Sequence, residues 1–271
     1  MSEVNEISVP DRTTNSAIPT VEELFDLSGR VALVTGGSRG LGREMVRAFA
    51  AQGADVVIVS RKVESCEELA REIRLKTDRQ AVAYGCHVGR WAELDALVKE
   101  VYENFGRVDI LVNNAGMSPV YDRLEDVSEK LFDSVLNINL KGPFRLSVLV
   151  GTRMARGNGG VIINVSSTGS VRNAPSIIPY AAAKSGLNSL TEGLAQALGP
   201  KVRVNTLMSG PFLTDISRAW DLPAHVDNAR LKTVLQRIAS PEEVVGAALF
   251  LASDASCYTS GVALRVDGGI I

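Results

Sequence analysis

Short apolar runs alternate with helical patterns along most of this chain, which sharply narrows its possible folds. We expect strands at Val31–Thr35, Asp55–Ser60, Ala81–Tyr84, Val108–Val112, Val161–Val165 and Val202–Thr206. We expect helices at Leu41–Gln52, Glu64–Lys76, Trp91–Phe105, Ser128–Arg156 (interrupted near Gly142-Pro143) and Ile178–Leu198. Strands that are apolar throughout are buried on both faces, which requires a parallel sheet covered by helices on either side. The pattern therefore predicts an α/β fold with a doubly wound parallel sheet of about seven strands.

The same alternation predicts the domain organisation. No proline-rich or Gly/Ser-rich linker divides the chain, so we expect one domain over residues 23–271. The opening residues are polar and show no periodicity, and we expect a flexible N-terminal extension over residues 1–22. The segment Asp215–Ser240 breaks the alternation. In a doubly wound fold such an insertion often covers the ligand crevice at the carboxyl ends of the strands.

Composition argues against several classes of function. The net charge is −2 and the two signs are interspersed, so no basic surface for nucleic acid or an anionic membrane is expected. The longest apolar runs are shorter than a membrane span. The three cysteines (Cys66, Cys86 and Cys257) have no metal-ligand spacing and the two histidines are far apart, so we expect no metal site. Unpaired cysteines without a secretory signal indicate a cytoplasmic protein.

A glycine-rich turn follows the first expected strand. It reads Thr35-Gly-Gly-Ser-Arg-Gly-Leu-Gly42, and a helix is expected directly after it. Glycines at such a turn let the backbone approach a pyrophosphate, and the helix N-terminus supplies amide donors and a positive dipole. The strand before and the helix after favour nucleotide binding over an ordinary tight turn.

Tyr180 and Lys184 lie one helical turn apart, with Ser167 upstream. The spacing i, i+4 places both side chains on one face of a helix. An ammonium near a phenol lowers the pKa of the phenol from about 10 toward the neutral range. A hydroxyl such as that of Ser167 could hold a carbonyl oxygen beside the phenol. The pair alone is a short motif that also occurs by chance, and its plain alternative is a half-buried tyrosine on an exposed helix.

With the glycine turn and this pair together, the chain resembles the short-chain dehydrogenases/reductases over Leu27–Gly269. These proteins have a single-domain Rossmann fold. The matching positions occur in the family's order: Thr35–Gly42 (TGxxxGxG), Asn113–Gly116 (NNAG), Asn139, Ser167 thirteen residues before Tyr180, Tyr180 with Lys184, Gly210 with Thr214, and the closing stretch from Gly261 to Gly269. The resemblance implies hydride transfer between a nicotinamide cofactor and a carbonyl or secondary alcohol.

The resemblance also implies a role for each catalytic candidate. Tyr180 is the proton donor in reduction and the proton acceptor in oxidation, and Lys184 lowers its pKa and binds the cofactor ribose. Ser167 holds the substrate oxygen, with Ser166 as the neighbouring alternative. Asn139 distorts the helix and holds a water that links Lys184 to solvent; its alternative is an ordinary polar helix residue. Asn113 and Asn114 could simply cap a turn, although a structural role beside the cofactor is favoured.

We expect the cofactor to be NADP(H), with NAD as the alternative. The end of the second strand, Val59–Lys62, has no carboxylate for ribose hydroxyls, whereas Arg39 and Arg61 suit a 2′-phosphate unless they are only solvated charges. The expected cofactor contacts are Gly36, Ser38, Arg39, Gly40, Leu41, Gly42, Ser60, Arg61, His87, Val88, Asn114, Ala115, Gly116, Tyr180, Lys184, Gly210 and Thr214.

Two positions depart from the family pattern. His87 stands where the family usually has an aspartate beside the adenine; it could stack on the adenine, hydrogen-bond to it, or make no contact. Ser209 replaces the usual proline before Gly210, and Pro211 follows instead.

The chain looks most like the 3-oxoacyl-carrier-protein reductase and gluconate dehydrogenase branches of the family. We expect a small-molecule carbonyl or alcohol substrate. Arg218, Arg230 or Lys232 could meet an acidic substrate, or could be solvated helix charges. The alternatives are an NAD-dependent alcohol or sugar-acid dehydrogenase, and a non-catalytic cofactor-binding protein. The resemblance further implies a homotetramer.

Overall fold

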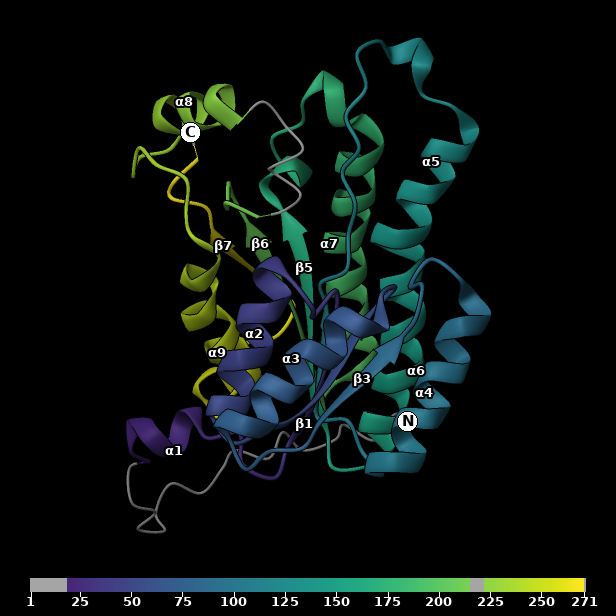
Figure 1. Ribbon diagram of the computed structural model, residues 1–271, viewed down its shortest axis with the longest axis vertical. Coiled ribbons are helices and arrows are strands. Elements are labelled where there is room, and N and C mark those ends of the chain that lie inside the picture. Colours follow the sequence, from purple (N-terminus) through teal and green to yellow (C-terminus); the bar gives the residue numbers. More distant parts are fainter. Residues whose placement is uncertain (1–18, 215–221, 271) are drawn as a thin grey trace, which may run out of the picture.

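The computed structural model describes residues 19–214 and 222–270 (Figure 1). Most of the expected extension, residues 1–18, and part of the irregular segment, residues 215–221, lie outside this range. Helix α1 (Val21–Phe25) begins at Thr20, whose hydroxyl accepts from the backbone N–H of Glu23 while the Glu23 carboxylate accepts from that of Thr20. Regular structure thus begins two residues before the domain boundary that we expected at residue 23.

Seven parallel strands form one sheet in the order β3-β2-β1-β4-β5-β6-β7, which confirms the predicted fold class. Their bounds are β1 Val31–Thr35, β2 Asp55–Ser60, β3 Ala81–Gly85, β4 Ile110–Asn113, β5 Gly160–Ser167, β6 Val202–Ser209 and β7 Ala263–Val266. Strands β5 and β6 run further than expected because they pair along eight residues, up to Ser167 opposite Ser209. This longer pairing carries the sheet up to the candidate catalytic serine.

Helices cover both faces of the sheet (Figure 1). On one face lie α2 (Gly40–Ala51), α3 (Val63–Lys76) and α9 (Val245–Ala252); on the other lie α4 (Trp91–Phe105), α6 (Gly142–Arg156) and α7 (Ile178–Leu198). Strand β1 shows why: Ala32 and Val34 pack with the first set, and Val31 and Leu33 with the second. Burying such a Val or Leu side chain contributes about 1.5–3 kcal/mol, so the two apolar layers stabilise the fold.

The helix expected over Ser128–Arg156 is divided. Helix α5 (Glu129–Leu136) passes into a π-helical segment, η2 (Asn137–Lys141), before α6 begins at Gly142. The expected interruption is confirmed, but it begins earlier than expected. At Gly142 an added Cβ would lie 2.2 Å from the carbonyl oxygen of Val88, so the close approach requires glycine. A π-helical turn inside a helix is often found at functional sites.

The irregular segment meets the C-terminal end of the chain. After helix α8 (Leu222–Lys232), the backbone N–H groups of Val234 and Leu235 donate to the carbonyl oxygens of Gly269 and Gly268, each at 3.0 Å. Figure 1 shows α8 and the C-terminus together at one end of the molecule. Five short 3-10 turns complete the described chain: η1 Leu124–Asp126, η3 Thr168–Ser170, η4 Pro175–Ile177, η6 Pro241–Val244 and η7 Asp254–Ser256.

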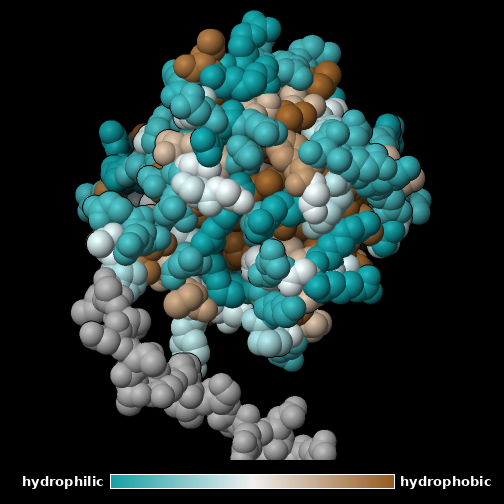
Figure 2. All heavy atoms as spheres, turned by 90° about the horizontal axis from the view of Figure 1, so that it is seen from below, coloured by the Kyte–Doolittle hydropathy of each residue, from teal (hydrophilic) through white to brown (hydrophobic). Residues whose placement is uncertain are grey.

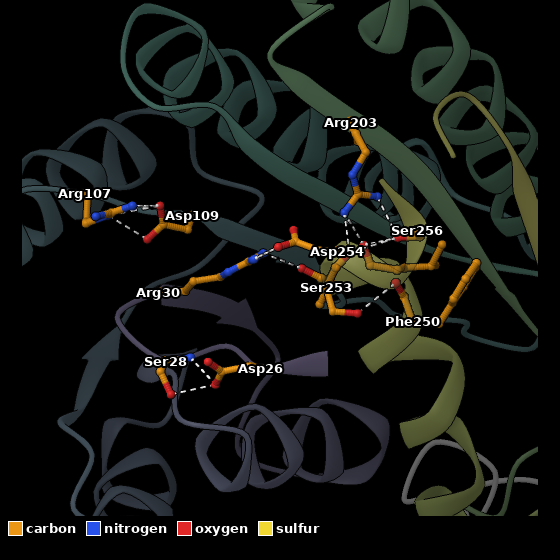
Figure 3. A network of polar contacts seen from close by, with 12 residues as sticks. Asp26, Ser28, Arg30, Arg107, Asp109, Arg203, Phe250, Ser253, Asp254 and Ser256 are labelled. Carbon is orange, nitrogen blue, oxygen red and sulfur yellow. Dashed lines mark hydrogen bonds and ion pairs between the residues drawn. The ribbon is translucent and has the colours of Figure 1, made fainter. Parts of the chain in front are cut away.

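At the opposite end, where the strands begin, polar groups bind one another (Figure 3). The Arg203 guanidinium, near the start of β6, donates to the carbonyl oxygens of Leu251 and Ser253, both at 3.0 Å, and to the Ser256 hydroxyl at 2.9 Å. Arg30 pairs with Asp254 at 2.7 Å. These bonds join the first strand, the sixth strand and the end of α9.

The face seen from below, on which α1 lies, is mostly hydrophilic, with hydrophobic side chains showing in small areas between polar ones (Figure 2). Among residues 19–214 and 222–270, no helix is both long and apolar enough to span a bilayer.

Candidate active site

A cavity of about 1120 Å³ opens at the carboxyl ends of the strands. It is lined by the glycine turn after β1, the segments that follow β2 to β6, and residues of α7 and α8. Every expected catalytic and cofactor-binding residue lines it except Gly42 and Asn139. The structure thus gathers residues that are up to about 180 positions apart in sequence at the crevice where doubly wound folds bind ligands.

The glycine turn is built by close backbone packing. Gly36 has a φ of +64°, and a Cβ on Gly42 would lie 2.3 Å from the Gly36 carbonyl oxygen. The Asn114 amide donates to the carbonyl oxygens of Thr35 and Gly36, at 2.9 and 3.1 Å. Gly42 therefore shapes the turn from behind. Both amide N–H groups of Asn114 hold the glycine turn in place, which is the structural role expected for this residue.

Asn113 lies away from the cavity. It is 2% exposed, and its amide donates to the Asn164 side chain at 2.8 Å and to the Ser147 hydroxyl at 3.0 Å. These contacts fasten the end of β4 to β5 and α6, which is a structural role.

The geometry separates the two candidate serines. Ser166 is 1% exposed, and its hydroxyl donates to the backbone carbonyl oxygen of Lys184 at 3.4 Å. The Ser167 hydroxyl is hydrogen-bonded to Tyr180 and accepts from the backbone N–H of Gly169 at 3.1 Å. Because only Ser167 has its hydroxyl beside the phenol, it is the serine placed to hold a substrate oxygen there.

Tyr180 and Lys184 come together on α7. The Lys184 ammonium lies 5.8 Å from the centre of the Tyr180 ring and donates to the carbonyl oxygen of Val165 at 2.8 Å. Lys184 is 4% exposed, and this burial lowers its pKa to about 8. Burial also raises the pKa of Tyr180, and the hydrogen bond with Ser167 opposes that rise in part.

Our expectation that Lys184 lowers the pKa of Tyr180 therefore needs correction. Removing a phenol from water penalises its charged form, and here this effect exceeds the stabilisation from its neighbours. The same burial lowers the pKa of Lys184 to about 8, so its ammonium loses the proton at a lower pH than a solvated lysine does. The Tyr180 phenol is consequently protonated at neutral pH, the form that donates a proton.

Asn139 is fully buried behind the cavity, within the π-helical segment. Its amide donates to the carbonyl oxygens of Met117 and Val135, both at 2.9 Å, and its side-chain oxygen accepts from the Met117 N–H at 3.2 Å. A Cβ on Gly116 would lie 2.9 Å from that oxygen and 3.7 Å from the Lys184 Nζ. Asn139 thus ties the loop after β4 to the distorted helix, directly beside Lys184.

Two exposed arginines reach the cavity near the glycine turn and the end of β2. Among the described residues, the side chains of Arg39 and Arg61 make no ion pair or hydrogen bond, unlike most arginines of the chain. Nearby, a Cβ on Gly40 would touch the Thr214 side chain at 3.5 Å, so the segment after β6 closes over the glycine turn.

Ser209 and Gly210, where the family pattern is altered, adopt close backbone packing. The Ser209 hydroxyl donates to the carbonyl oxygen of Ser166 at 3.0 Å. The Gly210 N–H donates to the Val266 carbonyl oxygen at 2.9 Å, and a Cβ on Gly210 would lie 2.5 Å from the Asp267 Cα. The loop is therefore fixed to β5 and β7 without the usual proline.

Several lining residues were not predicted individually. Arg172 and Asn173 line the cavity from the segment between β5 and α7, as does Ser118 after β4. They lie in loops after β4 and β5, where no spacing rule identifies the residue that faces inward. Lys232 lines the cavity as proposed, whereas Arg230 lies near Asp227, 3.7 Å away, and is not a lining residue. Arg218 lies outside the described residues.

The charges around the cavity share one sign. Its described lining residues include Arg39, Arg61, Arg172, Lys184 and Lys232, but no aspartate or glutamate. Together with the turn at the N-terminus of α2, whose first turn has no acidic residue, this arrangement favours anionic ligands.

Comparisons with known proteins agree with the fold. Residues 36–271 match the family model described as enoyl-(acyl carrier protein) reductase. The chain is 38% identical to D-threitol dehydrogenase of Mycolicibacterium smegmatis over 248 residues, covering 90% of this chain and 94% of that protein. It is 37% identical to the 3-oxoacyl-acyl-carrier-protein reductase of Chlamydia trachomatis over 246 residues, covering 90% and 98%.

A solved structure also matches this chain over most of its length. A gluconate 5-dehydrogenase from Burkholderia cenocepacia, crystallised with NADP and tartrate, superposes with a TM-score of 0.87 at 35% identity, covering 92% of this chain and 98% of that one. These relatives are dehydrogenases and reductases that match this chain along nearly its whole length. The chain belongs to the short-chain dehydrogenase/reductase family of oxidoreductases.

Proposed function

We propose that this protein catalyses NADP(H)-dependent interconversion of a ketone and a secondary alcohol, and that Ser167, Tyr180 and Lys184 carry the proton chemistry. The hydrogen bond between Ser167 and Tyr180 inside the cationic cavity is the observation that carries this proposal. A protein that only binds a cofactor would not need this hydroxyl pair beside a buried lysine.

The residues present fit a dinucleotide phosphate. The backbone of Gly36 to Gly40 at the start of α2 would hold the pyrophosphate, in a turn where Gly36 and Gly40 adopt positive φ angles. Arg39 and Arg61 would bind the 2′-phosphate through their planar forks. When bound, NADP(H) supplies or accepts the hydride. Gluconate 5-dehydrogenase of B. cenocepacia, a structural neighbour, was crystallised with NADP.

Tyr180 would donate a proton to the substrate oxygen during reduction. Its raised pKa keeps the phenol protonated at neutral pH, and Ser167 would hold the same oxygen and stabilise the charge that develops on it. Lys184 would bind the ribose through its ammonium. Asn139 would keep this segment of the chain π-helical. In that shape, a backbone carbonyl oxygen of the segment would bind a water next to Lys184.

We favour a carboxylate-bearing substrate of the sugar-acid type. Arg172 and Lys232 line the cavity, and the described lining residues include no carboxylate that would repel an acid. The tartrate in the neighbouring gluconate 5-dehydrogenase structure is itself a hydroxy acid. A 3-oxoacyl thioester is the alternative, because a 3-oxoacyl-acyl-carrier-protein reductase is among the relatives.

The test is a substrate panel with both cofactors. Purified protein is assayed for NADPH and NADH oxidation with oxo sugar acids, 3-oxoacyl thioesters and uncharged ketoses, and in the reverse direction with the alcohols. We expect the highest kcat/KM for NADPH with an oxo sugar acid. A preference for the thioester would shift the substrate class, a preference for NADH would overturn the cofactor assignment, and inactivity on every carbonyl would favour a non-catalytic role.

We also propose that the protein forms a homotetramer. Phe132 of α5 and Phe144 of α6 are 41% and 37% exposed, and Tyr258 near the edge strand β7 is fully exposed. Exposed aromatic residues are typical of protein interfaces. Sedimentation velocity should show one species of four subunits, and a monomer would contradict the proposal.

A further inference from the structure

His87 follows β3 and lines the cavity with its imidazole held in one orientation. Its Nδ1 accepts a hydrogen bond from the backbone N–H of Gly89 at 3.2 Å, and a Cβ on Gly89 would lie 3.1 Å from the imidazole Cε1. Because Nδ1 is an acceptor, the neutral ring carries its proton on Nε2. The side chain therefore presents an N–H donor away from the Gly89 turn.

Among residues 19–214 and 222–270, no carboxylate accepts a hydrogen bond from the His87 imidazole. The nearby Glu93 accepts from the backbone N–H of His87 at 2.7 Å and from Arg90 at 2.8 Å, and it does not line the cavity. The neighbouring Cys86 thiol is buried, which raises its pKa to about 12 and leaves it uncharged. The polar side chain that the end of β3 offers to the cavity is the imidazole.

The order of the strands places His87 at the base end of a bound dinucleotide. Outward from the glycine turn after β1, the next strand ends at Ser60 and Arg61, and the one beyond it ends beside His87. In a doubly wound fold the pyrophosphate lies on the turn after the first strand and the adenosine half extends over the first strands of the sheet. A ribose phosphate near Arg61 leaves the purine near the end of β3.

We propose that His87 presents an N–H donor to the purine of the cofactor, so that recognition of the base does not require its 6-amino group. The inference rests on the proposed use of NADP(H). Adenine offers ring-nitrogen acceptors as well as its 6-amino donor, and a 6-oxo purine such as hypoxanthine offers the N7 and O6 acceptors. A donor can pair with N7 in either base, whereas an acceptor beside N7 and the 6-position pairs with the amino group of adenine and is repelled by the carbonyl oxygen of hypoxanthine.

The dissociation constants of NADPH and of its reduced hypoxanthine analogue test the proposal directly. Both are measured by nicotinamide fluorescence on wild type, His87→Asn and His87→Asp. Either replacement can accept from the Gly89 N–H as His87 does, but Asn offers a donor to the base and Asp only an acceptor. The two variants are nearly equal in size, so they differ mainly in polarity.

We expect wild type and His87→Asn to bind the two dinucleotides within about threefold of each other. We expect His87→Asp to prefer NADPH by about tenfold or more, the effect of about 1.4 kcal/mol in base recognition. The comparison uses the ratio of the two dissociation constants within each protein. Any general repulsion between the new carboxylate and the phosphates affects both dinucleotides equally and cancels in this ratio.

A wild-type protein that binds NADPH at least tenfold better than the hypoxanthine analogue would overturn this inference while leaving the proposed function intact. Equal ratios in His87→Asp and His87→Asn would also overturn it, because the polarity at this position would then not matter. If wild type bound neither dinucleotide, the proposed cofactor would fail together with the inference.

Discussion

The arginine side chains at the two ends of the sheet differ in whether they have hydrogen-bond or ion-pair partners. At the amino ends, the Arg203 guanidinium binds carbonyl oxygens and a hydroxyl, and Arg30 pairs with Asp254 (Figure 3). At the carboxyl ends, the side chains of Arg39 and Arg61 have no ion pair or hydrogen bond among the described residues. The hydrogen-bonded arginines at the amino ends stabilise the fold, and the two arginines without a described partner at the carboxyl ends are available to ligands.

Strand β6 shows this contrast within a single element. It begins beside Arg203, whose burial lowers the pKa of the guanidinium yet leaves it fastened to backbone oxygens. It ends at Ser209, next to the loop that closes over the glycine turn. Substitutions at one end should therefore reduce stability and leave chemistry intact, while substitutions at the other should do the reverse.

The largest expected effect is on turnover, at the carboxyl end. Tyr180→Phe removes the phenolic proton but keeps the ring, so kcat should fall by about 10³-fold, within the range for losing a general acid. The melting temperature should stay close to that of wild type because the packing is kept. Steady-state kinetics and thermal unfolding check both parts, and a variant that keeps most of its turnover would refute the role of Tyr180.

At the amino end we expect a loss of stability instead. Arg203→Met leaves several buried carbonyl oxygens without donors and should lower the free energy of unfolding by about 2–4 kcal/mol. The exposed Lys130→Met serves as a control and should change stability by less than about 0.5 kcal/mol. Urea unfolding measures both. If kcat of the folded Arg203→Met protein fell as far as that of Tyr180→Phe, the amino end of the sheet would also contribute to turnover, which would contradict the distinction between the two ends.

A smaller effect is expected for cofactor choice. Arg39→Ala and Arg61→Ala should each weaken NADPH binding by about tenfold, the loss of one charge-assisted contact, and leave NADH binding nearly unchanged. Arg71→Ala, an exposed arginine on α3 outside the cavity, is the matched control and should change neither. Equal losses for the two cofactors would show that these arginines do not contact a 2′-phosphate.

An effect of similar size concerns the stability of the site itself. The pKa of Lys184 is about 8 in the folded protein and 10.5 when unperturbed, so the folded state is penalised for holding the charge below pH 8. Lys184→Met should therefore raise the free energy of unfolding at pH 7 by about 1–2 kcal/mol, after the loss of the bond to Val165 is subtracted.

This gain has a definite pH dependence. Between pH 8 and 10.5 the unfolded wild-type chain binds the Lys184 proton and the folded one does not, so wild-type stability rises relative to the variant. The advantage of the variant should shrink and then reverse across that window in chemical unfolding experiments. A variant that is less stable at pH 7, or a difference that is constant with pH, would mean that burial does not destabilise the charged form of Lys184.

The fold and most of the site follow from sequence patterns because these depend on local periodicity. Apolar runs such as Val31–Thr35 and the spacing from Tyr180 to Lys184 are visible in any window of a few residues. The resemblance implied a helix distortion at Asn139, but periodicity did not place its start at Asn137, because that start depends on contacts of Asn139 and Gly142 with Met117 and Val88.

Other features depend on contacts that are distant in sequence. The partners of Arg203 are backbone oxygens 48 to 50 residues away, which carry no pattern at all. The raised pKa of Tyr180 comes from burial, which spacing does not reveal. The inward position of Arg172 likewise depends on how the segment after β5 folds against α7.

Titration of the wild-type protein with NADPH and with NADH, followed by nicotinamide fluorescence, tests most directly whether the carboxyl end of the sheet is built for a dinucleotide phosphate. We predict saturable binding of NADPH at least about tenfold tighter than that of NADH, which corresponds to about 1.4 kcal/mol. Equal affinities, tighter binding of NADH, or no binding of either would contradict the account.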